Sequence, residues 1–239
     1  MRDFGAWVAR RRREAGSSAR LDAHLVTPSL RDVGSALRTG RRDLVGIPTV
    51  SPTAASGAVE LVDRVLAADV AALAVAADPG PGASLTAMRA LSEQLPSTPL
   101  LLLDPVVVEG QVLEGRLAGA DAVALPVGFL DEAEIRRLAQ VARSTLMAPM
   151  FVVRTVAEWE TACRADARFL LVSSPDGALA PALDLSRRLP PQVSSCLWVE
   201  GLDSAKAVRA LAGSADGALL GTDYPLSSWT DVAVVEPER

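Results

Sequence analysis

Residues 99–126 read PLLLLDPVVVEGQVLEGRLAGADAVALP, in which two apolar runs flank a more polar stretch. The runs Pro99–Asp104 and Asp121–Pro126 are apolar at nearly every position, as strands buried on both faces of a parallel sheet must be. The stretch Gln111–Leu117 between them suits a helix. A strand, a helix and a second strand in this order predict a βαβ unit.

The same alternation extends over most of the chain. The candidate strands are Asp43–Val50, Val70–Ala76, Pro99–Asp104, Asp121–Pro126, Pro149–Arg154, Phe169–Ser173, Ser195–Glu200 and Gly217–Gly221. The candidate helices are Ala58–Ala67, Ser84–Gln94, Gln111–Leu117, Asp131–Thr145, Val156–Arg164, Pro181–Arg188 and Ser204–Ala212. Eight strands alternating with helices in 239 residues predict an α/β protein of the (β/α)8 TIM-barrel type. An open doubly wound sheet is the alternative, but it normally needs fewer strands.

Residues 1–42 precede the first strand and are expected to form an N-terminal helical extension that caps one end of the barrel. Residues 43–239 then form the barrel, within a single domain overall. The run Arg10–Arg13 is expected to be a solvated helix face, and the alternative is a docking surface for an acidic partner. The apolar runs are too short to cross a bilayer, and no secretory signal opens the chain.

Composition limits the chemistry that this chain can perform. It contains one lysine, Lys206, one histidine, His24, and two cysteines, Cys163 and Cys196. Acid–base or nucleophilic catalysis would therefore use mainly carboxylates, hydroxyls and arginine. The net charge of −5 argues against a nucleic-acid partner, and two distant cysteines suit a reducing, cytoplasmic setting without a metal centre.

Several segments resemble motifs of the indole-3-glycerol phosphate synthase family. The matching segments are Val50–Thr53, Asp78 with Gly82–Leu85, Leu103–Pro105 with Gln111, Glu114 and Gly119–Ala122, Glu200–Leu202, and Asp216–Gly221. The resemblance implies a (β/α)8 lyase of tryptophan biosynthesis, which closes the indole ring with loss of carbon dioxide. It covers nearly the whole predicted barrel.

The departures from the family gather at its catalytic positions. Gly46 and Pro48 stand at the glutamate and lysine of the family's first strand, and Leu103 stands at the lysine that ends its third. Val152 replaces a glutamate, and Ser173 replaces an asparagine. Each general acid or base contributes about 10²–10⁴-fold to a rate. The resemblance therefore implies the fold without implying the family's activity.

Other polar residues at the predicted strand ends are the candidates for a site. Asp104 and Glu200 are the catalytic candidates; Asp104 is alternatively a loop cap, and Glu200 is alternatively an ion-pair partner of Arg154. Arg154, Ser173 and Ser174 are the candidates for binding a substrate. Trp198 is expected to face outward, against the helices.

The resemblance also implies a phosphate site after the last strands. Its candidates are Ser51, Gly201, Gly221 and Thr222. No cofactor and no metal are expected. The expected partner is a small anionic or phosphorylated molecule, and a partner enzyme or a homodimer is the protein partner to consider.

Three functions remain open at this point. The first choice is a remodelled barrel that acts on an indole-like or anthranilate-derived metabolite, in specialised metabolism. The alternative is a catalytically inactive family member that binds a ligand or regulates a partner, and the third is a genuine synthase. Polar side chains converging in one pocket favour the first, whereas a barrel mouth filled by Leu103 and Val152 favours the second.

Overall fold

The computed structural model describes residues 4–15, 26–37, 44–55, 59–77, 82–176, 178–190, 192–199, 202, 204–222, 224 and 228. Its strands form one parallel sheet that closes on itself. The first strand of the barrel consists of two pieces, β1 (Val45–Ile47) and β2 (Thr49–Val50). β1 pairs with the last strand and β2 pairs with the next strand along the chain, so the barrel is complete.

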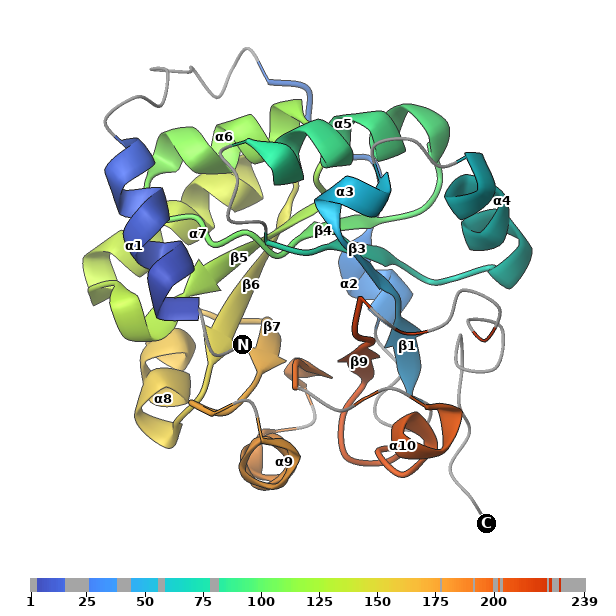
Figure 1. Ribbon diagram of the computed structural model, residues 1–239. Helices are drawn as coiled ribbons and strands as arrows, with labels where there is room; N and C mark the ends of the chain where they lie inside the picture. The colour runs from blue at the N-terminus through green and yellow to red at the C-terminus, as the bar shows by residue number, and fades with distance from the viewer. Residues whose placement is uncertain are drawn as a thin grey trace.

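The remaining strands and the helices alternate around the barrel, with the helices as an outer ring (Figure 1). The strands are β3 (Leu73–Val75), β4 (Leu100–Leu102), β5 (Ala122–Pro126), β6 (Ala148–Val153), β7 (Phe169–Val172), β8 (Ser194–Leu197) and β9 (Gly217–Leu219). The helices of the ring are α3 (Pro52–Ala55), α4 (Val59–Ala68), α5 (Ala83–Gln94), α6 (Glu109–Leu117), α7 (Glu132–Ser144), α8 (Val156–Arg164), α9 (Leu179–Arg188) and α10 (Ala205–Arg209), with a 3-10 turn, η3 (Val127–Phe129). The predicted barrel is confirmed, and each predicted element has a counterpart.

The first strand differs from its prediction because of Pro48. Proline has no N–H group and cannot donate to a neighbouring strand. Its carbonyl still accepts a hydrogen bond from the N–H of Ala74 at 2.9 Å, while Ile47 accepts one from Leu220 at 2.9 Å. The chain therefore changes partners at Pro48, from β9 to β3, and the single strand predicted over Asp43–Val50 is interrupted there.

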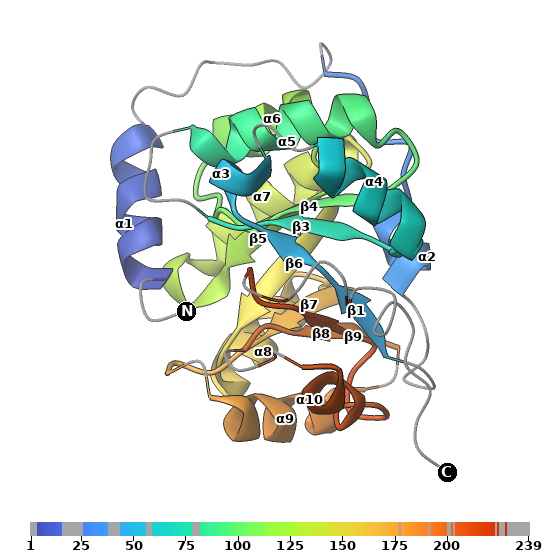
Figure 2. The ribbon, with the colours of Figure 1, turned by 45° about the vertical axis from the view of Figure 1, so that its right-hand side comes forward.

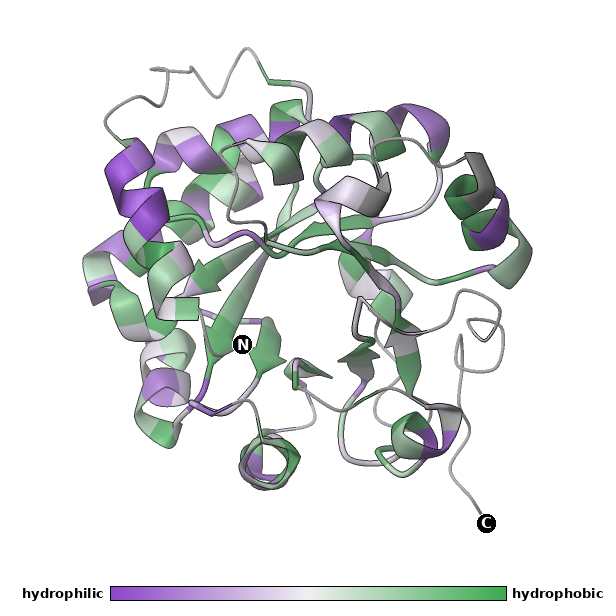
Figure 3. Cartoon of the chain, viewed as in Figure 1, coloured by the Kyte–Doolittle hydropathy of each residue, from purple (hydrophilic) through white to green (hydrophobic). Residues whose placement is uncertain are grey.

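Strand residues alternate between the barrel interior and the helix-covered outside. Leu101 and Leu103 belong to the interior cluster, whereas Leu100 and Leu102 pack outward with the helices. Both kinds of position are apolar, as the hydropathy colouring of the strands in Figure 3 shows. Burial on both faces explains why these strands could be recognised as continuous apolar runs.

Two helices before the barrel lie at its opposite ends, as Figure 2 shows. In α1 (Phe4–Glu14), the ring of Phe4 contacts residues that follow β5 and β8, at the carboxyl ends of the strands. In α2 (Val33–Leu37), the two terminal residues join the interior cluster at the amino ends. The N-terminal extension therefore covers the carboxyl end of the barrel with α1, as expected of a cap, and also contacts the amino end with α2.

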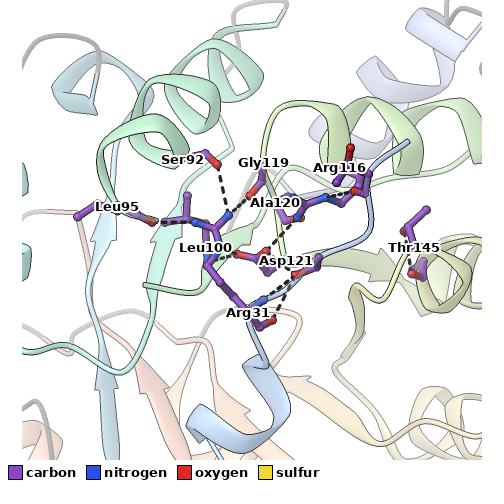
Figure 4. A network of polar contacts seen from close by, with 12 residues as sticks. Arg31, Ser92, Leu95, Leu100, Arg116, Gly119, Ala120, Asp121 and Thr145 are labelled. Atoms are coloured by element: carbon purple, nitrogen blue, oxygen red, sulfur yellow. Dashed lines mark hydrogen bonds and ion pairs between the residues drawn. The ribbon is translucent and has the colours of Figure 1, made fainter. Parts of the chain in front are cut away.

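At the amino end, a network of polar contacts surrounds Asp121 (Figure 4). Its fully buried carboxylate lies 2.7 Å from Nε of Arg31 and 2.9 Å from Nη1 of Arg116. It also accepts hydrogen bonds from the hydroxyl of Ser29 at 2.6 Å and the backbone N–H of Leu100 at 2.8 Å. Two cations and two neutral donors thus compensate for the burial of one carboxylate.

Arg31 extends this network from the N-terminal extension to two turns of the barrel. Its guanidinium donates to the carbonyl oxygens of Leu95 at 2.8 Å and Gly119 at 2.6 Å. Gly119 has a φ of 98°, and a Cβ atom there would lie 2.1 Å from Oγ of Ser92. Only glycine suits this turn, because it tolerates positive φ and leaves room for the serine.

Replacing Asp121 should strongly destabilise the fold. Asp121→Asn leaves Arg31 and Arg116 without their buried anion, which should lower the free energy of unfolding by about 3 kcal/mol or more. Glu109→Gln is the control, because Glu109 forms only an exposed ion pair at 3.9 Å, and its effect should stay within about 0.5 kcal/mol. Urea denaturation followed by circular dichroism measures both, and equal effects would contradict the central place of Asp121.

Candidate functional site at the barrel mouth

The mouth of the barrel, at the carboxyl ends of the strands, is apolar on its inner surface. Leu103 and Val152, which stand where the family resemblance places a lysine and a glutamate, are each 1% exposed. Both belong to the interior cluster, which also contains Phe4 and Val8 of α1. The hydrocarbon lining of the barrel therefore continues directly into the helix that lies over the mouth.

Four aromatic rings form an aromatic cluster over this lining. Phe4 is its centre, with ring centroids 5.6 Å from Trp198, 6.0 Å from Phe129 and 6.1 Å from Trp7, all edge-on. Such edge-on pairs contribute about 0.5–1.5 kcal/mol each beyond the area that they bury. Aromatic residues make up only 4% of the chain, so their concentration at the mouth is distinctive.

The expectation that Trp198 faces outward was wrong. Cys196 belongs to the interior cluster and Trp198 packs against that cluster, whereas Leu197 lies in the outer one. Apolar residues occupy both faces of β8, so alternation alone does not indicate which face points inward. The contact with Phe4 of α1, which is distant in sequence, decides the orientation of Trp198.

Asp104, a predicted catalytic residue, is held by α1. Its carboxylate is 3% exposed and lies 2.6 Å from Nη2 of Arg10 and 3.9 Å from Nε of Arg11. Burial raises the pKa of Asp104; the charges of Arg11 and Arg10 lower it, and Glu14 raises it. Asp104 is thus an ion-pair partner of α1 in this state of the protein.

The run Arg10–Arg13 is not the solvated helix face that was expected. Arg11 is 3% exposed, and its Nε donates to the carbonyl oxygen of Pro105 at 3.2 Å. Arg12 donates to the carbonyl oxygen of Phe129, and Arg13 is exposed. Four successive residues point in four directions around a helix, so a charge run does not reveal which of its members are buried. The spacing of Phe4, Val8 and Arg11 was the available signal, because these three form the buried face of α1.

Arg154, a predicted substrate-binding residue, lies at the rim beside the aromatic cluster. Its guanidinium lies 2.9 Å from Oε1 of Glu158 and 4.7 Å from the centroid of the Phe129 ring. A Cβ atom at Gly128 would lie 2.2 Å from Glu158 and 2.7 Å from Arg154, so glycine leaves the room for this ion pair. The structure therefore brings Arg154 and Asp104 to the same side of the mouth, next to α1 and η3, each with a partner.

The two serines after β7 form a local turn. Ser173 is fully buried, and its hydroxyl lies 3.4 Å from the carbonyl oxygen of Ser174. The hydroxyl of Ser174 lies 2.7 Å from Oδ1 of Asp176, and this hydrogen bond, with one from the N–H of Ala178, lowers the pKa of Asp176. Both hydroxyls thus have partners within their own loop.

The predicted phosphate-binding residues lie at the rim. Ser51 is half-buried after β2, and Gly221 and Thr222 are exposed after β9. A Cβ atom at Gly221 would meet no atom within 4 Å, so the backbone there is accessible to a ligand. Gly201 and the predicted catalytic residue Glu200 lie outside the described residues.

Among the residues that the structure describes, no group of three or more His, Cys, Asp or Glu side chains is placed to hold a metal ion. No helix described in the structure is long and apolar enough to cross a membrane.

The raised pKa of Asp104 determines how its contribution to the stability should change with pH. Because folding raises its pKa, the folded state binds this proton more tightly than the unfolded chain does. The contribution of this protonation to the free energy of unfolding is fully present below the ordinary pKa of 3.8. It is lost as the pH rises through the raised pKa of the folded state. Asp104→Asn removes the titration, so the melting temperature of the native protein minus that of the variant should be larger at about pH 4 than at about pH 8. Thermal melts followed by circular dichroism test this, and a difference that grows with pH would contradict the raised pKa.

Comparisons with known proteins agree with the barrel and indicate its family. Residues 8–232 match the family model described as indole-3-glycerol phosphate synthase. The chain is 30% identical over 232 residues to the indole-3-glycerol phosphate synthase of Micrococcus luteus, covering 88% of this chain and 85% of that protein. It is 35% identical over 145 residues to the enzyme of that name from Opitutus terrae, covering 58% of this chain and 54% of that protein. The chain thus spans about half the length of several curated relatives that it matches.

Solved structures support the fold alone, because their sequence identity is low. A tryptophan synthase alpha chain from Legionella pneumophila has a TM-score of 0.60 and 13% identity, covering 86% of this chain and 95% of that one. A mutant tryptophan synthase alpha-subunit from Pyrococcus furiosus has a TM-score of 0.59 and 16% identity, covering 80% and 96%. The family is shown by the sequence comparisons, because the family model matches most of the chain and the Micrococcus luteus relative is 30% identical over most of both proteins. This chain therefore belongs to the indole-3-glycerol phosphate synthase family.

Proposed function

We propose that this protein is a divergent family member that binds a small aromatic acid at its barrel mouth and does not close the indole ring. The observation that carries this proposal is the hydrocarbon at Leu103 and Val152, both buried beneath α1. Ring closure needs a proton donor at the substrate carbonyl, and neither side chain can donate or accept a proton. Losing two such groups costs about 10⁴-fold in rate or more, if each contributes at least 10²-fold.

The class of ligand follows from what surrounds the mouth. The aromatic cluster places the half-buried rings of Trp7, Phe129 and Trp198 at the mouth, and a planar ring could pack against them. Arg10 and Arg154 lie beside it, paired with Asp104 and Glu158, and a ligand's carboxylate or phosphate would take the place of one of these partners. An anthranilate-like or indole-like acid combines these two features, and a role in specialised metabolism is consistent with a site that has lost the family's acid–base groups.

A second candidate function keeps catalysis with Asp104. Burial raises the pKa of this carboxyl, which is the change that lets a carboxylic acid donate a proton at a higher pH than usual. Asp104 lies at the carboxyl end of β4, where barrel enzymes place reacting groups. In this function the arginines of α1 would have to leave the carboxylate before it could act.

The first prediction from this proposal concerns turnover and binding. Purified protein should not convert carboxyphenylamino-deoxyribulose phosphate to indole-3-glycerol phosphate above the buffer rate. Anthranilate should raise the melting temperature, because a ligand at 100 times its dissociation constant adds about 2.7 kcal/mol to the stability. Cyclohexanecarboxylate, which has the carboxylate without the aromatic ring, is the control ligand. Measurable turnover, or no shift with anthranilate, would refute the proposal.

The second prediction locates the ligand in the aromatic cluster. Trp198→Ala should weaken anthranilate binding by about threefold to tenfold, the size expected for loss of one aromatic contact. Trp159→Ala is the matched control, because Trp159 lies on α8 and packs against the outer cluster. Calorimetric titration of both variants measures the affinities. Equal weakening by both changes would place the ligand outside the mouth.

A further inference from the structure

Helix α1 lies over the inner surface of the mouth. Phe4 is 2% exposed at the centre of the aromatic cluster, and Val8 packs with it on the barrel lining. Reacting and binding groups of a (β/α)8 barrel lie at this face. The docked position of α1 therefore covers the site that the proposed function uses.

A small set of contacts holds α1 in this position. Beyond the apolar contacts of Phe4 and Val8, Arg10 pairs with Asp104 at 2.6 Å. The side-chain amide of Gln111 donates to the carbonyl oxygen of Arg11 at 2.8 Å. These contacts come from the second half of the helix, and they join it to the loop after β4 and to α6.

The balance of forces on α1 makes this docking reversible. A helix of 11 residues is marginal without tertiary contacts, so its folding depends on the barrel. The charges of Arg10 and Arg11 are nearly buried, and the gain from pairing buried charges is largely offset by their loss of water. The buried Nη2 atom of Arg11 has no hydrogen-bond partner, which adds a cost to the docked state that solvent would relieve.

We propose that α1 is a lid that leaves the mouth as a unit, with the Arg10–Asp104 ion pair as its latch and Phe4 as the plug that it withdraws. Opening exposes Phe129 and Trp198 at the mouth to a ligand and frees Asp104 from its arginine. The lid regulates the same mouth as the proposed function, and it rests on that function only for the identity of the molecule that enters.

Hydrogen exchange without any ligand tests the lid. Arg10→Gln removes the charge of the latch, and the amides of α1 should then exchange at least about tenfold faster than in the native protein. Amides of α6 and α7 should exchange at the native rate, because the barrel stays folded. Arg13→Gln is the matched control on the same helix, since Arg13 is exposed, and it should behave as the native protein does.

A second variant covers the case in which Arg10→Gln fails to fold. Phe4→Ala removes the ring that packs on the barrel lining and should accelerate exchange in α1 in the same selective way. Unchanged exchange of α1 in both variants, or equal acceleration in α1, α6 and α7, would overturn the lid. Since no ligand takes part, this test can fail while anthranilate still binds, and binding can fail while the lid still opens.

Discussion

Asp104 is a carboxylate that the fold buries at the end of β4, beside an interior lining that includes Leu103 and Val152. A buried carboxylate needs compensating charge, and here that charge comes from α1, in Arg10 and Arg11. The requirement brings α1 onto the mouth, and α1 in turn carries Phe4 into the aromatic cluster. The orientation of Trp198 and the covering of the lining thus depend on the same docked helix that compensates this buried charge.

Each end of the barrel buries a carboxylate, and the two ends compensate its charge in different ways. At the amino end, Asp121 has two arginines, a serine hydroxyl and a backbone N–H around it, and this set joins the N-terminal extension to the barrel. At the carboxyl end, Asp104 is paired by a short helix whose buried guanidinium of Arg11 is incompletely hydrogen-bonded. The contacts at the amino end thus favour stability, whereas the carboxyl end is where we propose that α1 opens. This agrees with the general division of labour between the two ends of this fold.

The barrel could be predicted from the sequence because its strands are apolar on both faces and its helices are regularly spaced between them. Because strand residues are apolar on both faces, the sequence did not show which side of β8 faces inward. The orientation of Trp198 could therefore not be predicted. Leu103 and Val152, which stand where the family resemblance implies a lysine and a glutamate, were also visible in the sequence. The meeting of Asp104 with Arg10 was not, because it joins residues 94 positions apart through a helix whose charge run resembles an exposed surface.

The coupling between Arg10 and Asp104 is the most direct measure of this account. A double-mutant cycle built from Arg10→Gln and Asp104→Asn, read out as the opening of α1 by hydrogen exchange, isolates their interaction from other effects of each change. The account predicts that Arg10→Gln opens α1 much less in the Asp104→Asn background than in the native one, because its partner is already gone. If the two effects instead multiply, the residues act independently, and the ion pair does not hold the helix on the mouth.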